Sequence, residues 1–272
     1  MRRAVVAAWH DFNKPLEGRL PYPYLDCRGL LTTGVGNLIE PVGYARTLPW
    51  RLPDGSRASA EDAAAQLVRV KSLAVPESTI KQWQKNHGSA PLPLQLRGGG
   101  FFAGVTTLRL TDPDIDELVR DKLVKMAGDL LEQFPAFDEW PADAEMGILS
   151  VSWARGQMGY ASAFPRMTRL LLAGDFAGAA DECKLDDDFD DDGKPDGGTI
   201  TIRNERNKAL FKAAARVVAH GLDPDVLHGF GTPPPAPTVP DVEVRGDPIT
   251  AANQTALQEL IDSYEPEFSD DG

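Results

Sequence analysis

Three side chains near the N-terminus, two carboxyls and a hydroxyl, are of the types used in acid–base chemistry on a sugar. Glu17, Asp26 and Thr32 lie in the segment LEGRLPYPYLDCRGLLTTGVGNL, nine and then six residues apart. Glycoside hydrolysis needs one protonated carboxyl to donate to the leaving oxygen and one ionised carboxyl to activate water. A neighbouring hydroxyl such as Thr32 can hold that water. On spacing alone, a solvated pair of surface carboxylates is the commoner explanation.

The elements around these residues decide whether their environments differ. Residues 4–16 carry apolar side chains at helical spacing, so we expect a short helix that Glu17 closes, with Pro15 weakening its last turn. Residues 19–40 are rich in Gly, Tyr and Thr and predict a small antiparallel hairpin or three-stranded sheet. A carboxyl at the edge of a helical core and one on a solvent-facing strand would have pKa values pushed apart.

The rest of the chain is predicted to be mainly helical. Ser59 followed by Asp62 predicts a helix start, as does Thr111 or Asp112 before Pro113. Further helices are expected over residues 141–156, over 163–183 with a break at Ala173-Gly174, and over 203–221. Residues 85–104 read as a long irregular loop with a strand. The predicted class is α+β, with the sheet as the minor part.

The negative charge is concentrated in two segments. The chain has a net charge of −13, of which residues 181–198 carry −7 and residues 232–272 carry −8. The remaining body is therefore close to neutral. Because no basic stripe exists to neutralise phosphates, nucleic acid is not expected as a partner.

A dense motif covers the opening segment. Its pattern is EGxxxxxYxDxxGxxTxGxG, formed by Glu17, Gly18, Tyr24, Asp26, Gly29, Thr32, Gly34 and Gly36. This pattern resembles the N-terminal signature of phage-type lysozymes. The segments LTDPDIDELVRDKLVKM, MGILSVSWARG, FPRMTRLLLAGDFAGAADE and RNERNKALF resemble later parts of the same family. The resemblance covers residues 4–38 and about 109–220.

The resemblance implies a lysozyme-like fold, with a small N-terminal antiparallel sheet and a mainly helical C-terminal lobe. It also implies a muramidase that cleaves peptidoglycan between N-acetylmuramic acid and N-acetylglucosamine with inversion of configuration. Glu17 would be the general acid, while Asp26 and Thr32 would place the attacking water. Arg203 and Arg206 fall where family members carry arginines near the cleft, so they are candidate substrate contacts. No cofactor is required for this reaction.

The chain also departs from the family. Asn37 stands where the family usually has histidine, and residues 41–108 are much longer than in compact members. We therefore expect a catalytic domain over residues 1–231 with an inserted region at about 41–108. Residues 232–272 would form a proline-rich linker and an acidic tail with a short helix.

An acidic loop offers a candidate calcium site. Asp188, Asp190, Asp192 and Asp196 occupy positions 1, 3, 5 and 9 of an EF-hand-like loop, with Gly193 at position 6. Position 12 is Thr199 rather than the usual glutamate. The loop either binds Ca²⁺ or is a solvated acidic loop.

An aromatic group near the motif is a candidate for stacking on sugar rings, and we include Tyr24 among the candidate substrate-binding residues. Core packing is the commoner use of such side chains. The group consists of Tyr22, Tyr24, Trp50, Phe101 and Phe102.

The N-terminal apolar stretch Ala4 to Trp9 is too short for a signal peptide, and no apolar run could span a membrane. We expect a monomer made in the cytoplasm without a signal peptide, which acts on the cell wall or in the periplasm after export, lysis or injection. That describes a phage endolysin, a virion-associated lysin or a secreted antibacterial effector. A delivery, docking or immunity protein would then be a partner.

Two other functions remain open. The chain could be a non-catalytic, lysozyme-like binding or structural module of a larger assembly. Such scaffolds usually lose at least one of the three catalytic residues, and all three are present here. It could also be a lytic transglycosylase, which forms an anhydro sugar and would not require Asp26.

Overall fold

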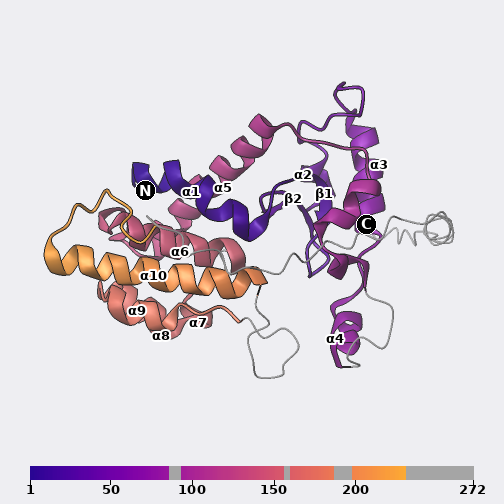
Figure 1. The fold of residues 1–272 in the computed structure, drawn as a ribbon. Helices are drawn as coiled ribbons and strands as arrows, with labels where there is room; N and C mark the ends of the chain where they lie inside the picture. The colour runs from indigo at the N-terminus through magenta and orange to yellow at the C-terminus, as the bar shows by residue number, and fades with distance from the viewer. Residues whose placement is uncertain (86–92, 156–159, 187–197, 231–272) are drawn as a thin grey trace. The chain divides into compact units, whose positions relative to one another are not determined.

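The computed structural model describes residues 1–85, 93–155, 160–186 and 198–230. The fold is α+β: one three-stranded antiparallel sheet accompanies a mostly helical chain (Figure 1). The strands are β1 (Leu20–Leu25), β2 (Leu31–Gly34) and β3 (Asn37–Leu38), in the order β1-β2-β3. Tyr24 pairs with Thr32 across the sheet. Pro21 and Pro23 lack an N–H, which suits the edge position of β1 and its irregular register.

Helix α1 (Arg3–Glu17) delivers Glu17 to the sheet. Its apolar side chains Val5, Trp9 and Phe12 are buried, and Pro15 does not stop the helix before Glu17. Gly18 ends it with a φ of +70°, a conformation that glycine adopts without strain. The prediction that Glu17 closes the first helix is confirmed.

Two predicted helix starts are also confirmed. The Ser59 side chain accepts a hydrogen bond from the N–H of Asp62 at the start of α3 (Ala60–Lys71). Thr111 and Asp114 form a capping box at the start of α5 (Asp112–Gln133), with Pro113 in the first turn. These local signals set where both helices begin.

The remaining long helices surround α6 (Ala142–Arg155), which is buried from Ala142 to Trp153. Helix α10 (Gly198–His220) packs on α6 and on α9 (Phe176–Glu182), and α1 also contacts α6 and α10. Helices α7 (Tyr160–Ala163) and α8 (Pro165–Leu172) complete this part, and α8 ends at the predicted break before α9. The short η3 (Phe137–Glu139) precedes α6.

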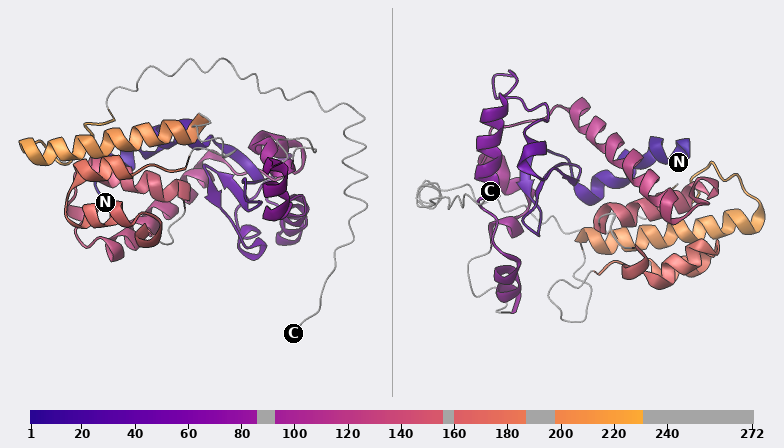
Figure 2. Two further views of the ribbon diagram at one scale, coloured as in Figure 1. Left: turned by 90° about the horizontal axis from the view of Figure 1, so that it is seen from below. Right: turned by 180° about the vertical axis from the view of Figure 1, so that it is seen from behind.

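The region 41–108 packs on the sheet. It contains α2 (Val42–Ala45), α3, α4 (Glu77–Lys85) and the 3₁₀ helices η1 (Leu94–Arg97) and η2 (Gly99–Gly104). Helix α3 contacts β1 and β2, and η2 contacts β1. Figure 2 shows α3 beside the strands from two further sides. Trp50, Leu67 and Phe102 are fully buried in the same core as the helical part. The strand expected within 85–104 is wrong for the described residues, which form η1 and η2 because their apolar side chains turn into this core.

Contacts divide the chain into a unit over Met1–Thr232 and a second unit over Pro233–Gly272. The second unit, with its predicted linker and short helix, lies outside the described residues. Within the described ranges, no helix is both long and apolar enough to cross a membrane.

We predict that the region 41–108 unfolds together with the rest of its unit. Leu67 is 0% exposed and its neighbour Val68 is 53% exposed. Leu67→Ala should lower the free energy of unfolding by about 2–5 kcal/mol, because it leaves a cavity in the shared core. Val68→Ala is the matched control and should change it by less than about 0.5 kcal/mol. Chemical denaturation followed by far-UV circular dichroism and by tryptophan fluorescence measures both.

One transition seen by both probes is expected for Leu67→Ala. A separate early transition in which only part of the helical signal is lost would contradict a shared core.

Candidate active site

Glu17 is held at the end of α1 by a buried arginine. Its side chain is 22% exposed, and its Oε1 accepts a hydrogen bond from Nη2 of Arg203, which is 1% exposed. Nη1 of the same guanidinium donates to Oγ of Ser150 at 3.1 Å, to its carbonyl at 3.2 Å and to Oδ1 of Asn13 at 3.3 Å. Arg203 therefore joins α10 to α6 and α1 and fixes the Glu17 carboxyl.

The surroundings of Glu17 favour its protonated form. Burial raises its pKa, while the positive charges of Arg203 and Lys122 lower it, and the net pKa lies above that of an ordinary glutamate. Glu17 can thus keep a proton to higher pH than a solvated carboxyl does. That is the property that a general acid requires.

The turn between β2 and β3 approaches Glu17 closely. Gly36 has a φ of +68°, and a Cβ at this position would lie 2.6 Å from Oε2 of Glu17. Nε1 of Trp153 on α6 donates to the carbonyl of Val35 at 3.0 Å and fixes this turn. Only glycine satisfies both the backbone conformation and the space at position 36.

Asp26 lies in the turn that follows β1. Its Oδ1 accepts hydrogen bonds from the N–H groups of Arg28 at 2.9 Å and Leu30 at 2.8 Å. Burial raises its pKa and these two bonds oppose the change, with a net pKa above the usual value. Both of these hydrogen bonds are made to Oδ1. The pKa values of both carboxyls are raised, and the expectation that the two values are pushed apart stays a prediction.

The region 41–108 braces this turn. Gln95 is buried, with its Oε1 accepting from the N–H of Val75 at 2.7 Å and its Nε2 donating to the carbonyl of Cys27 at 3.4 Å. Nζ of Lys71 donates to the carbonyl of Gly29 at 2.8 Å. No local sequence pattern predicts this support, because Gln95 is far along the chain from the turn that it holds.

The two threonines of β2 have different roles. Oγ1 of Thr33 donates into the sheet, to the carbonyl of Tyr22 at 3.1 Å. Oγ1 of Thr32 instead donates to the carbonyl of Leu30 at 3.1 Å, and the N–H of Leu30 bonds Asp26. Thr32 and Asp26 therefore share one residue as a partner, whereas the Thr33 hydroxyl is used within the sheet.

The Tyr24 phenol lies within the electrostatic influence of both carboxyls. Burial is the main cause that raises the pKa of its phenol, and the negative charges of Glu17 and then Asp26 raise it further. Both carboxyls thus lie close enough to act on one phenol. Tyr24 itself is largely buried, and Trp50 and Phe102 are core residues rather than exposed platforms for sugar.

The structure places the two candidate arginines against α1. Arg203 is buried and its contacts are internal, so it positions Glu17 rather than lying on an open surface. Arg206 donates from Nη1 to the carbonyl of Phe12 at 2.9 Å and lies over the Phe12 ring.

The candidate calcium ligands Asp188, Asp190, Asp192 and Asp196 lie outside the described residues. Within the described part of the chain, no group of three or more His, Cys, Asp or Glu side chains is placed to hold a metal ion.

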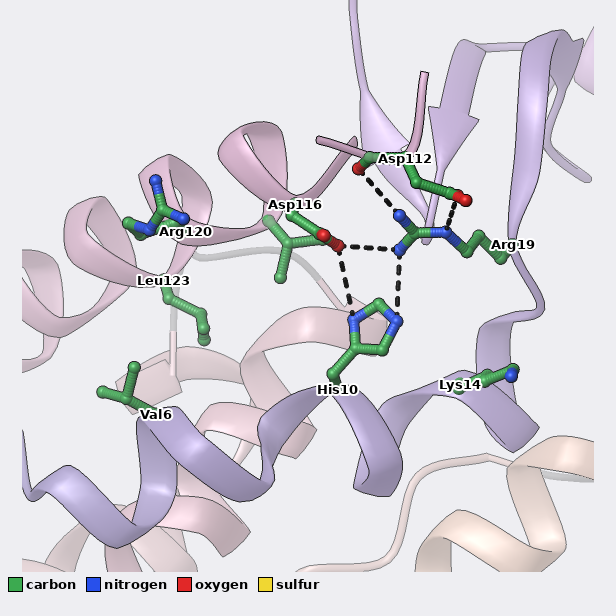
Figure 3. Close-up of a pocket in the computed structure, with 9 residues that line it drawn as sticks. Val6, His10, Lys14, Arg19, Asp112, Asp116, Arg120 and Leu123 are labelled. Carbon is green, nitrogen blue, oxygen red and sulfur yellow. Dashed lines mark hydrogen bonds and ion pairs between the residues drawn. The ribbon is translucent and has the colours of Figure 1, made fainter. Parts of the chain in front are cut away.

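A cavity of about 580 Å³ lies elsewhere, between α1 and α5 (Figure 3). Arg19 donates to Oδ1 of Asp112 at 2.8 Å, to Oδ1 of Asp116 at 2.9 Å and lies 3.1 Å from Nε2 of His10. None of Glu17, Asp26 and Thr32 lines this cavity. Arg19 therefore ties the start of β1 to the start of α5 through Asp112 and Asp116.

Lys122 is a further residue near Glu17 that the sequence analysis missed. The sequence pattern does single it out, because position 122 falls on the same face of α5 as the buried Ile115, Val119 and Met126. A lysine on the buried face of a helix is unusual.

Comparison of the chain with family models, with curated proteins and with solved structures finds no match.

Proposed function

We propose that the protein is a muramidase that hydrolyses the bond between N-acetylmuramic acid and N-acetylglucosamine in peptidoglycan, on a lysozyme-like fold. The observation that carries the proposal is the state of Glu17. It is a partly buried carboxyl with a raised pKa, fixed by a buried arginine at the end of a helix, and both it and the Asp26 carboxyl act electrostatically on the Tyr24 phenol. The resemblance of the opening segment to phage-type lysozymes agrees with these roles.

In the proposed reaction, Glu17 donates its proton to the glycosidic oxygen as the bond to the anomeric carbon breaks. Asp26 takes a proton from a water that Thr32 helps to orient, and the water oxygen forms the new bond from the opposite face. The configuration at the anomeric carbon is therefore inverted. Arg203 stabilises the Glu17 carboxylate that remains. The reaction uses side chains and water, so the proposal needs no cofactor.

The proposal includes the setting of the enzyme. Its substrate lies in the cell wall or periplasm, which the chain would reach as an endolysin, a virion-associated lysin or a delivered effector. Residues 41–108 and the acidic segment 232–272 are the parts available for docking a delivery or immunity partner.

Product analysis tests the proposal. The full chain is incubated with purified peptidoglycan of several chemotypes, and the soluble fragments are analysed by mass spectrometry. We expect fragments with hydrated reducing ends, formed initially as the inverted anomer. Anhydro ends would instead identify a lytic transglycosylase, and absence of digestion on every chemotype would favour a non-catalytic module.

Glu17→Gln should lower the rate of peptidoglycan hydrolysis by at least about 100-fold, because general acid catalysis contributes about 10²–10⁴-fold. Glu117→Gln on the exposed side of α5 is the matched control and should keep wild-type activity. Circular dichroism establishes that both variants are folded. A fully active Glu17→Gln variant would overturn the assignment.

The two threonines should respond differently to removal of their hydroxyls. Thr32→Val should lower activity by about 10-fold or more with a small change in stability, because it removes the water-orienting group. Thr33→Val should destabilise the fold by about 1–2 kcal/mol, because the Tyr22 carbonyl loses its donor, while the chemistry remains. Turnover of peptidoglycan and chemical denaturation measure the two effects. The opposite pattern would assign the water to Thr33.

A further inference from the structure

Lys122 is fixed between a backbone carbonyl and an aromatic ring. Its Nζ donates to the carbonyl of Gly36 at 2.9 Å and lies 3.6 Å from the centroid of the Trp153 ring. Trp153 is itself buried and bonded to the Val35 carbonyl. The ammonium group is therefore held by two elements, the turn between β2 and β3 and helix α6.

The same turn meets the Glu17 carboxyl. A Cβ on Gly36 would lie 2.6 Å from Oε2 of Glu17, whereas Oε1 bonds Arg203. Lys122 thus reaches the turn that borders one carboxyl oxygen, and Arg203 binds the other. Taking a lysine out of water is costly, so a partly buried lysine needs a compensating charge or bond.

We propose that Lys122 is a positioning residue for Glu17, whose ammonium group, fixed by Trp153 and Gly36, supplies a second positive charge that stabilises the carboxylate left after proton donation. The catalytic consequence of this inference rests on the proposed function. The charge coupling itself does not, because it is a property of the folded protein.

The groups that face Glu17 come from several elements. They are Arg203 from α10, Lys122 from α5 and Tyr24 from β1. Burial lowers the pKa of Lys122 to about 8, the Glu17 carboxylate opposes that change, and Arg203 adds to it. Lys122 therefore loses its charge at mildly alkaline pH. When it does, Glu17 keeps only one of its two cations, and its own pKa rises.

The coupling is tested without any substrate. The pKa of Lys122 is measured by NMR titration of its ¹³Cε and Hε signals, in the wild type and in Glu17→Gln. Loss of the Glu17 carboxylate should lower the Lys122 pKa by at least about 0.5, because the negative charge that stabilises the protonated ammonium group is removed. Lys125, 68% exposed on the same helix and paired with Asp129, is the internal control and should not change. An unchanged Lys122 pKa would overturn the proposal.

The catalytic role is tested by the pH dependence of peptidoglycan hydrolysis. The acid must be protonated, so activity falls as pH rises through the Glu17 pKa. Lys122→Met removes a positive charge that lowers the Glu17 pKa. The alkaline limb of the pH–activity profile should therefore move to higher pH by at least about 0.5 pH units. Lys122→Arg keeps the charge and should leave the limb near its wild-type position, as should Lys125→Met.

Lys122→Met that changes the rate at every pH, with no movement of the limb, would mean a merely structural role and overturn the proposal. A protein that shows the Lys122 response in NMR but never digests peptidoglycan would support the charge coupling and overturn the muramidase assignment. These two failures are therefore distinguishable.

Discussion

The ion pair between Arg203 and Glu17 is the interaction on which the rest of the site depends. A buried guanidinium must be paired, and removing one partner from such a pair typically costs about 3–5 kcal/mol. Arg203 satisfies this requirement with groups from α1 and α6 while it lies on α10. The pair therefore fixes the end of α1 against the helical core, and it holds the Glu17 carboxyl in one position.

The two sides of the site are held by different parts of the fold. Helices α5, α6 and α10 supply the charges and the ring around Glu17. The turn that carries Asp26 is instead bonded by Gln95 and Lys71 from the region 41–108. The region 41–108 also shares one hydrophobic core with the helices. The shape of the Asp26 turn depends on it, so it is part of the site's framework.

The sequence predicted what local rules determine. The end of α1 at Glu17, the caps at Ser59 and Thr111 and the antiparallel sheet all follow from neighbouring residues. It did not predict that Arg203 would be buried on Glu17, that Lys122 would lie on Trp153, or that Gln95 would brace the turn after β1. Each of these contacts joins residues far apart in the chain, and no periodicity or capping signal encodes such a pairing. Only Lys122 among these residues is marked by a sequence pattern, since it interrupts the apolar face of α5.

The titration of the Glu17 carboxyl tests the central claim most directly. Selective ¹³C labelling of glutamate side chains, with Glu17→Gln used for assignment, gives its pKa in the folded protein by NMR. The structure predicts a pKa above the ordinary glutamate value of about 4.3, because burial outweighs the two neighbouring cations. A pKa at or below that value would show that the cations dominate, and Glu17 would then be unable to serve as the general acid.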